Sequence, residues 1–530
     1  MVLKVLVADD ISMLGLQKLD VLANTEVVIR VGMTESELLE EVKDADALLV
    51  RSQTQVTAAV LDAARRLRVV GRAGVGVDNI DVAHATKKGV IVVNAPDGNT
   101  IAAAEHTFAL LMSVARYIPL AHRSVMAGEW KRKNFIGVEL LGKTLGIIGM
   151  GRIGTEVALR ARAFKMKILG YDPFLTEERA AELGIVKTDL ETSIRQADFL
   201  TVHTPLTKDT RHLINSEAFA SMKKGVRIVN CARGGIIDEV ALCAALEEGK
   251  VAAAALDVFE NEPLPADSPL KEAPNLILTP HLGASTVEAQ EQVAISVAEE
   301  VAHILADEPF KNAVNLPALS AEQLTVLSPV LELGEQLGAF MGQLFSGDLA
   351  DVQITVGGEW TKQDTGFLSR TVLKGLLAQG YADEVNYVNA PTIAAGIGLS
   401  VSDVKQARSK VYTSFLSVSA SVSGVRHTVV GTLYNGSRPR IVEIDNYRID
   451  AEPYGSIIFT YHMDQPGMIG KIGSLIGEAG VNIASMQVGR TESGGEAIML
   501  LCVDRMVPED VVTNIAKVAG VRKVRMLQLA

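Results

Sequence analysis

Arg233, Glu262 and His281 each come a few residues after a short apolar run in the middle of the chain. If these runs are neighbouring parallel strands, their carboxyl ends meet at one edge of a sheet. A guanidinium can hold the carboxylate of a 2-keto acid bidentately, and an imidazole can move the proton of the matching hydroxyl. A nearby carboxylate orients the imidazole and favours its protonated form. The three residues therefore predict proton-coupled chemistry on a small 2-hydroxy or 2-keto acid.

Each of these residues also has a plainer interpretation. A histidine at a strand end is more often structural, Glu262 could be a solvated loop carboxylate as we expect of Glu260, and Arg233 could form a surface ion pair. Their joint occurrence, and the glycines after Arg233, favour a site. Among the other histidines, His203 ends a strand and could line a cofactor cleft, whereas His106 lies in a helix and reads as structural.

A glycine fingerprint predicts a dinucleotide site. Gly149-x-Gly151-x-x-Gly154 follows a predicted strand and begins a predicted helix. Asp172, at the end of the next predicted strand, is the acidic residue that such a fingerprint requires. The first glycine permits the turn, the second lets the backbone approach a pyrophosphate, and the third lets the helix pack closely. Asp172 would accept hydrogen bonds from the ribose hydroxyls and would repel a 2′-phosphate, which favours NAD over NADP. The alternative is a glycine-rich turn in some other α/β domain.

The length, net charge and cysteine count of the chain limit the class of protein. With 530 residues the chain is too long for one core, and three or four domains are expected. A net charge of −12 argues against general nucleic-acid binding. Cys231, Cys243 and Cys502 lack paired spacing, so neither a disulfide framework nor a cysteine metal site is expected. We found no signal peptide and no apolar run of bilayer length, and we expect a cytoplasmic protein with no membrane contact and no bound metal.

The order of apolar runs predicts the fold class: α/β, with two Rossmann-like or flavodoxin-like doubly wound parallel-sheet domains, then an α+β domain and a ferredoxin-like βαββαβ domain. A long helical stretch is predicted over 100–126, a helix returning to the first domain over 286–306, and a hairpin from 414 to 435. The expected domains are 1–98 with 286–310, 99–285, 311–453 and 454–530.

These motifs resemble those of the D-isomer-specific 2-hydroxyacid dehydrogenases. The matching stretches are Gly71–Asp81, Gly149–Gly154, Asn230–Gly235, Ala255–Phe259 and Pro280–Thr286. The tail is similar to that of the long-form D-3-phosphoglycerate dehydrogenases, which carry an intervening domain and an ACT domain. The resemblance implies NAD-dependent oxidation of 3-phospho-D-glycerate to 3-phosphohydroxypyruvate, the first step of phosphorylated L-serine biosynthesis.

The resemblance also implies residue roles. Arg233, Glu262 and His281 are the implied catalytic residues. The implied NAD-binding residues are Gly149, Gly151, Arg152, Ile153, Gly154, Asp172, Thr204, Cys231, Ala232, Asp257, His281 and Gly283. Val75 replaces a family threonine, which puts one contact to the nicotinamide in doubt. Cys231 is expected to be a packed residue rather than a nucleophile.

The substrate phosphate requires cations. The implied substrate-binding residues are Arg51, Arg72, Asn99, Arg132 and Lys133. Arg132 and Lys133 are expected to reach in from a neighbouring subunit, with a solvated basic loop as the alternative. A homo-oligomer is therefore expected, either a dimer or a homotetramer.

The tail resembles a regulatory module. Asp464 and Asn482 match the ACT ligand motif, with L-serine as the implied effector bound across a pair of domains. The alternative is a dimerisation module that does not respond to serine. Two other functions stay open for the whole chain: another 2-hydroxyacid dehydrogenase, such as a hydroxypyruvate or glyoxylate reductase, and a catalytically silent NAD-sensing regulator.

Overall fold

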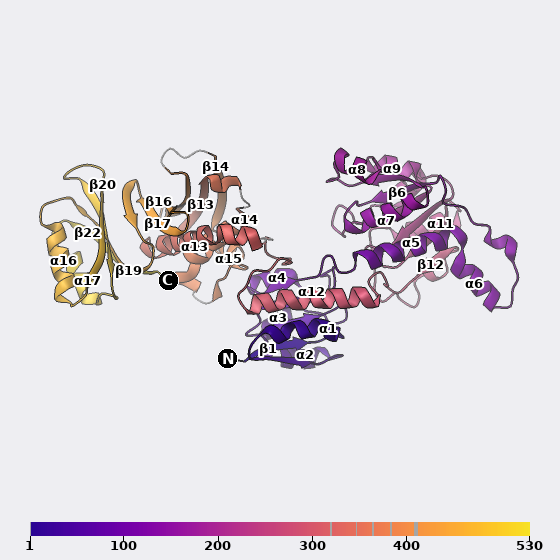
Figure 1. Ribbon diagram of the computed structural model, residues 1–530, viewed down its shortest axis with the longest axis horizontal. Coiled ribbons are helices and arrows are strands. Elements are labelled where there is room, and N and C mark those ends of the chain that lie inside the picture. The colour runs from indigo at the N-terminus through magenta and orange to yellow at the C-terminus, as the bar shows by residue number, and fades with distance from the viewer. Residues whose placement is uncertain are drawn as a thin grey trace.

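The computed structural model describes residues 2–317, 321–345, 347–362, 365–381, 384–407 and 412–529. Over these residues the chain forms four β-sheets, each with its own helices (Figure 1). The first two sheets are parallel throughout, the third is mixed and the fourth is antiparallel. The predicted fold class is confirmed.

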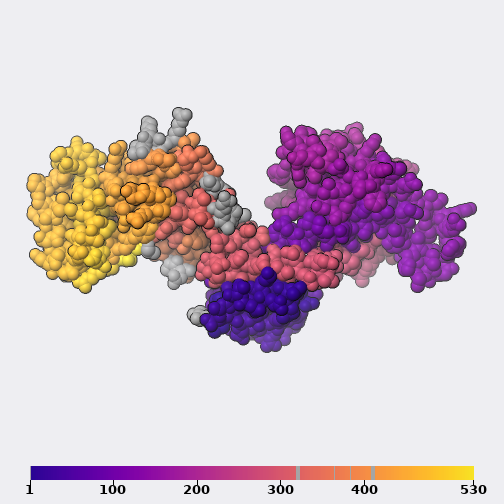
Figure 2. Space-filling view, in the orientation of Figure 1, coloured from indigo at the N-terminus to yellow at the C-terminus, as the bar shows by residue number. Residues whose placement is uncertain are grey.

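The first sheet has the strand order β2-β1-β3-β4-β5. Its elements are β1 (Leu3–Val7), α1 (Met13–Leu16), β2 (Thr25–Ile29), α2 (Glu35–Glu41), β3 (Ala47–Val50), α3 (Ala58–Ala63), β4 (Val69–Arg72), α4 (Val82–Lys87) and β5 (Ile91–Val93). Helix α12 (Val287–Leu305) returns from later in the chain and buries Val297 and Val301 against this sheet (Figures 1 and 2). The predicted returning helix is confirmed.

The second sheet has the order β12-β11-β10-β9-β6-β7-β8. Its strands are β6 (Thr144–Ile148), β7 (Lys167–Tyr171), β8 (Val186–Lys187), β9 (Phe199–Val202), β10 (Val226–Asn230), β11 (Val251–Leu256) and β12 (Leu276–Leu278). Its helices are α5 (Thr100–Arg116), α6 (Ile118–Met126), α7 (Arg152–Ala163), α8 (Glu177–Leu183), α9 (Leu190–Gln196), α10 (Ser216–Ser221) and α11 (Glu239–Glu247). The strand order reverses between β6 and β9, and at such a point open α/β sheets bind ligands beyond the carboxyl ends of their strands.

The helical stretch predicted over 100–126 is two helices rather than one. Tyr117 adopts a left-handed conformation, with φ of 54°, between α5 and α6. Pro119 then occupies the first turn of α6, where its missing N–H costs no intrahelical hydrogen bond. The break turns α6 outward from the second sheet, as Figure 1 shows.

The third sheet has the order β14-β13-β15-β16-β17-β18. Its elements are α13 (Ala321–Leu344), β13 (Leu349–Gly358), α14 (Gly366–Tyr381), α15 (Ala390–Gly396), β14 (Ser400–Gln406), β15 (Ser414–Val422), β16 (Val425–Tyr434), β17 (Arg438–Ile444) and β18 (Tyr447–Ala451). The predicted hairpin is confirmed as β15–β16. Its turn residues Ser423 and Gly424 both have positive φ, as a tight two-residue turn requires.

The fourth sheet has the order β20-β21-β19-β22 and confirms the predicted βαββαβ arrangement. Its elements are β19 (Gly455–Met463), α16 (Met468–Glu478), β20 (Ile483–Arg490), β21 (Glu496–Val503), α17 (Glu509–Ala516) and β22 (Val521–Leu529). The third and fourth sheets share one hydrophobic core, in which Phe340 and Phe459 pack edge to face with centroids 6.4 Å apart. Among the described helices, none combines the length and apolarity needed to cross a membrane.

Candidate active site

His281 and Glu262 form a close pair beyond the carboxyl edge of the second sheet. His281 Nδ1 lies 2.7 Å from Glu262 Oε2, and the Phe259 N–H donates to Glu262 Oε1 at 3.0 Å. Burial raises the pKa of Glu262, but the hydrogen bonds from His281 and Phe259 outweigh burial and hold that pKa below its usual range. The ionised carboxylate accepts from Nδ1–H, which leaves Nε2 free to exchange a proton with a ligand.

Arg233, Glu262 and His281 follow three adjacent parallel strands. Strand β11 pairs with β10 on one side and with β12 on the other, and the last residues of the three strands are aligned. The sheet therefore carries the three predicted residues to the same edge, as the sequence predicts.

Arg233 reaches from the second sheet to the loop after β4. Its Nε lies 3.3 Å from Asp78 Oδ2. Gly76 is so close that a Cβ added there would sit 2.2 Å from a guanidinium nitrogen of Arg233. Any side chain at position 76 would therefore displace the guanidinium.

Two further guanidinium groups lie on the first lobe. Arg72 ends β4, Arg51 follows the neighbouring strand β3, and Asn79 bonds both the Arg72 side chain and the Arg51 carbonyl. Burial and the nearby charges of Arg233 and Arg51 lower the pKa of Arg72 to about 10. A ligand with several negative charges would relieve this repulsion.

The glycine fingerprint has the geometry that a pyrophosphate needs. Gly149 has φ of 94°, and a Cβ added at Gly154 would lie 2.0 Å from the Gly149 carbonyl oxygen. At Gly151 the same test meets no atom within 4 Å, so the approach to the backbone is open there. Helix α7 begins at Arg152 with no side chain capping its first turn, so its N–H groups remain for a phosphate. The residues fit a dinucleotide.

Asp172 follows β7 beside this loop. Its carboxylate accepts from the N–H groups of Met150 at 2.9 Å and Phe174 at 2.8 Å. These bonds fix the carboxylate next to the glycine turn, and each oxygen keeps a second lone pair for a ribose hydroxyl.

Arg152 and Ile153 occupy the first turn of α7. Ile153 packs against the hydrophobic core of the second sheet. Arg152 Nε lies 2.5 Å from Asp97 Oδ1, in the segment where the chain crosses between the lobes. This exposed ion pair joins the fingerprint helix to the interlobe connection.

Three of the buried polar atoms that have no hydrogen-bond partner among the described residues lie just after β9 or just before α5. They are His203 Nδ1, Thr204 Oγ1 and Asn99 Oδ1. Burial lowers the pKa of His203 to about 4, so its ring is neutral. Because buried polar atoms are normally paired, these positions suit a ligand or a water molecule.

Asp257 is fully buried and holds the loop that carries His281. Its carbonyl accepts from the His281 N–H at 2.9 Å. Its carboxylate accepts four hydrogen bonds, which come from Thr279 Oγ1 at 2.6 Å, Leu282 N at 2.8 Å, Gly283 N at 2.8 Å and His106 Nε2 at 3.1 Å. Sequence reasoning missed His106. A single histidine in a helix gives no local signal of a partner that lies 151 residues later in the chain.

Cys231 and Ala232 complete the predicted cofactor-side residues. Burial raises the pKa of the Cys231 thiol to about 12, which leaves little thiolate near neutral pH. The Ala232 N–H donates to Asn230 Oδ1 at 2.9 Å. Both therefore lie in the ordered turn that leads into Arg233.

Comparisons with known proteins agree with this geometry. Residues 108–283 match the D-isomer specific 2-hydroxyacid dehydrogenase NAD binding domain, 326–445 the D-3-phosphoglycerate dehydrogenase intervening domain and 456–520 the ACT domain. The D-3-phosphoglycerate dehydrogenase of Bacillus subtilis is 45% identical, covering 99% of each chain. That of Methanocaldococcus jannaschii is 47% identical, covering 95% of this chain and 96% of its own.

The chain belongs to the D-3-phosphoglycerate dehydrogenase family. Its cofactor is NAD. Among solved structures, a glyoxylate reductase from Paecilomyes thermophila has a TM-score of 0.54 and 32% identity, covering 59% of this chain and 98% of its own. The apo D-lactate dehydrogenase of Escherichia coli has a TM-score of 0.53 and 26% identity, covering 59% of this chain and all of its own.

Arg132 and Lys133 lie apart from the residues above. They follow α6 in a short 3-10 helix (Arg132–Phe135), both are exposed, and no interaction among the described residues joins them to the Arg233 site. This segment belongs to the outward-turned arm of the second lobe (Figure 1). A single chain therefore does not bring Arg132 and Lys133 to its own candidate site.

Asp464 and Asn482 do not meet within one ACT domain. Asp464 follows β19 and pairs with Arg490 at 2.9 Å, whereas Asn482 precedes β20 and bonds Asp504 at 3.1 Å. The β21 partners of the adjoining strand ends are Glu496 and Val503, so the two residues lie about 23 Å apart along the sheet. One ligand can touch both only across a pair of domains.

Proposed function

We propose that this enzyme oxidises 3-phospho-D-glycerate to 3-phosphohydroxypyruvate with NAD, the first step of phosphorylated L-serine synthesis. The observation that carries the proposal is the pairing of a 2.7 Å His281–Glu262 contact with three clustered arginines, Arg51, Arg72 and Arg233. An acid with both a carboxylate and a phosphate supplies the negative charge that such a cluster favours. The names of the relatives point to the same substrate.

In this proposal Arg233 binds the substrate carboxylate and His281 Nε2 takes the proton of the C2 hydroxyl. Glu262 stabilises the imidazolium that forms. Arg51 and Arg72 hold the phosphate, and Asn99 at the start of α5 also binds the substrate. Bound NAD would supply the acceptor for the hydride that leaves C2. The residues proposed to hold it are Gly149, Gly151, Arg152, Ile153, Gly154, Asp172, Thr204, Cys231, Ala232, Asp257, His281 and Gly283.

The test is a steady-state assay that follows NADH absorbance with a panel of acids. We expect kcat/KM for 3-phosphoglycerate to exceed that for glycerate, and the reverse reaction to favour 3-phosphohydroxypyruvate over glyoxylate or hydroxypyruvate. A preference for the unphosphorylated acids would make the enzyme a hydroxypyruvate or glyoxylate reductase. NAD binding without turnover of any acid would leave an NAD-sensing regulator.

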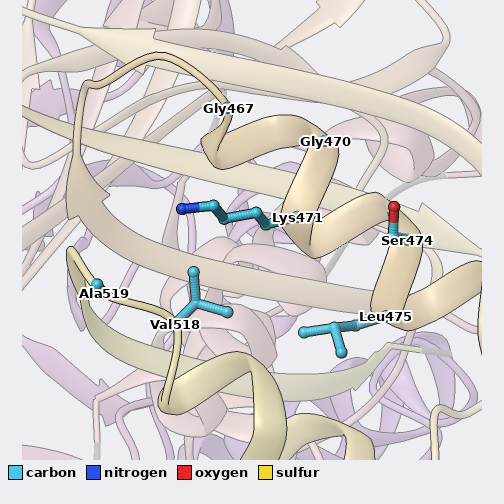
Figure 3. Close-up of a pocket in the computed structure, with 7 residues that line it drawn as sticks. All are labelled: Gly467, Gly470, Lys471, Ser474, Leu475, Val518 and Ala519. Atoms are coloured by element: carbon cyan, nitrogen blue, oxygen red, sulfur yellow. The ribbon is translucent and has the colours of Figure 1, made fainter.

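We also propose that the ACT domain binds L-serine. A hollow of about 590 Å³ opens beside α16 and the loop before β22 (Figure 3). Gly467, Gly470 and Lys471 line it, so small residues and an ammonium group face the hollow directly after the turn that carries Asp464, the residue that we expect to bind serine together with Asn482 of a paired domain. Calorimetry with L-serine and D-serine tests the proposal, and heat from neither enantiomer would leave a module that only dimerises.

A homo-oligomer, either a dimer or a homotetramer, completes the proposal. The arm around α6 exposes large apolar side chains: Val125 at 53%, Met126 at 74%, Trp130 at 79% and Ile136 at 76%. Covering this arm with a second subunit would carry Arg132 and Lys133 toward that subunit's substrate site. Sedimentation should give a dimer or tetramer, and a monomer would contradict the proposal. A cytoplasmic location is consistent with the free cysteines Cys231, Cys243 and Cys502.

A further inference from the structure

His106 is a half-buried side chain on α5, the helix that begins directly after the interlobe crossing. The imidazole lies on the face of α5 that packs against the second sheet. Its Nε2 is 3.1 Å from Asp257 Oδ1 and 3.3 Å from Thr279 Oγ1. The side chain is 19% exposed, so water competes little for these contacts.

Every other bond of the Asp257 carboxylate goes to the segment that carries His281. Thr279 lies just before His281, and the N–H groups of Leu282 and Gly283 lie just after it. His281 itself has φ of 54°, a conformation that a residue other than glycine adopts only when its surroundings hold it. Asp257 therefore acts as the anchor of a strained loop.

Among the described residues, His106 is the one donor to the Asp257 carboxylate that comes from outside the segment 279–283. Burial raises the pKa of Asp257, and the hydrogen bonds from His106 and Thr279 outweigh burial and keep that pKa low. An ionised carboxylate can accept all four donors at once, whereas a protonated one would have to donate toward one of them. The nearby Cys231 thiol has its pKa raised to about 12 by burial, so it stays protonated and offers only a weak S–H donor.

We infer that His106 is a positioning residue: its Nε2 fixes the Asp257 carboxylate, and that carboxylate fixes His281 for proton transfer. The inference rests on the proposed dehydrogenase function for its kinetic part and on the loop geometry alone for its structural part. It also links α5, which starts at the lobe crossing, to the loop that carries the acid–base residue.

The test compares His106→Gln with His106→Asn in the full-length enzyme. A glutamine places its amide nitrogen near the position of Nε2, whereas an asparagine is polar and similar in size but too short to reach Asp257. His303→Gln and His303→Asn are the matched controls, because His303 is exposed on α12 and its nearest ion-pair partner, Glu308, is 4.0 Å away. Hydrogen–deuterium exchange of the peptide over 279–286 is measured without cofactor, alongside kcat and the dissociation constant of NAD.

We expect faster exchange at Leu282 and Gly283 in His106→Asn than in His106→Gln, and a kcat lower by about tenfold or more, since small misplacements of reacting groups are costly. The glycine fingerprint is intact in both variants, so NAD affinity should change much less than kcat, and the two His303 variants should not differ. Equal exchange or equal kcat in the His106 pair would overturn the inference. Because exchange needs no substrate, an error in the proposed substrate leaves that comparison intact.

Discussion

The catalytic lobes and the ACT domain both place polar residues at strand ends, yet only the lobes bring them together within one chain. In the second sheet, three neighbouring parallel strands end at one edge, and Arg233, Glu262 and His281 follow them. In the ACT sheet, Asp464 follows the end of one strand and Asn482 precedes the start of another, at opposite edges.

The difference follows from strand direction. A parallel sheet gathers all its carboxyl ends on one side, so a single chain can assemble a site. In the ACT domain, β19 and β20 run in the same direction, so the end of β19 and the start of β20 lie at opposite ends of the strands. A ligand that touches both Asp464 and Asn482 therefore needs one of them from a second copy of the domain. In the proposed model, serine binding therefore requires two ACT domains, whereas the group of Arg233, Glu262 and His281 forms within one chain.

The largest expected effect lies in the lobes. His281→Ala should lower kcat by about 10²- to 10⁴-fold, because the imidazole moves the hydroxyl proton. The dissociation constant of NAD, measured by fluorescence quenching, should change much less than kcat, because His281 is only one of the residues proposed to hold NAD and the glycine fingerprint is intact. A kcat close to that of the unaltered enzyme would remove His281 from the acid–base role.

Arg72→Ala should raise the KM for 3-phosphoglycerate by about 10- to 100-fold, the size expected for losing hydrogen bonds to a charged group. The KM for 2-oxoglutarate in the reverse direction should rise much less, since that acid carries no phosphate. Arg51→Ala should show the same selectivity. Equal increases for both acids would argue against a phosphate site on the first lobe.

The ACT half of the comparison can be tested by mixing chains. Asp464→Ala and Asn482→Ala should each abolish the serine response. Subunit exchange between the two variants should restore about a quarter of the serine sites, because about half of the dimers are mixed and each holds one intact site. No recovery on mixing, despite confirmed exchange, would place the two residues in separate roles.

The smallest effect concerns the contact between Asp78 and Arg233. Asp78→Asn removes an exposed ion-pair partner of the guanidinium, and such pairs contribute at most about 1 kcal/mol. The substrate carboxylate then competes with one less anion, so KM should fall by no more than about fivefold with kcat maintained. A rise in KM would mean that Asp78 helps to hold Arg233 in its binding position.

Much of the fold was predictable because its signals are local. The fingerprint from Gly149 to Gly154, the hairpin at 414–435 and the βαββαβ order of the tail depend on turns and on periodicity within a few residues. The helix break at Tyr117 was not predicted, although Pro119 two residues later is typical of a helix start. The domain boundaries at 98, 285, 310 and 453 stay predictions.

By itself, the sequence determined which side chains are available and which strands they follow, since residue type and short-range pattern decide those. Only the tertiary structure decided that His106 meets Asp257, that Arg233 crosses to Asp78, and that Asp464 and Asn482 lie apart. These outcomes depend on how helices and strands distant in the chain pack together, and that packing is set by burial of shared apolar surface rather than by any local motif.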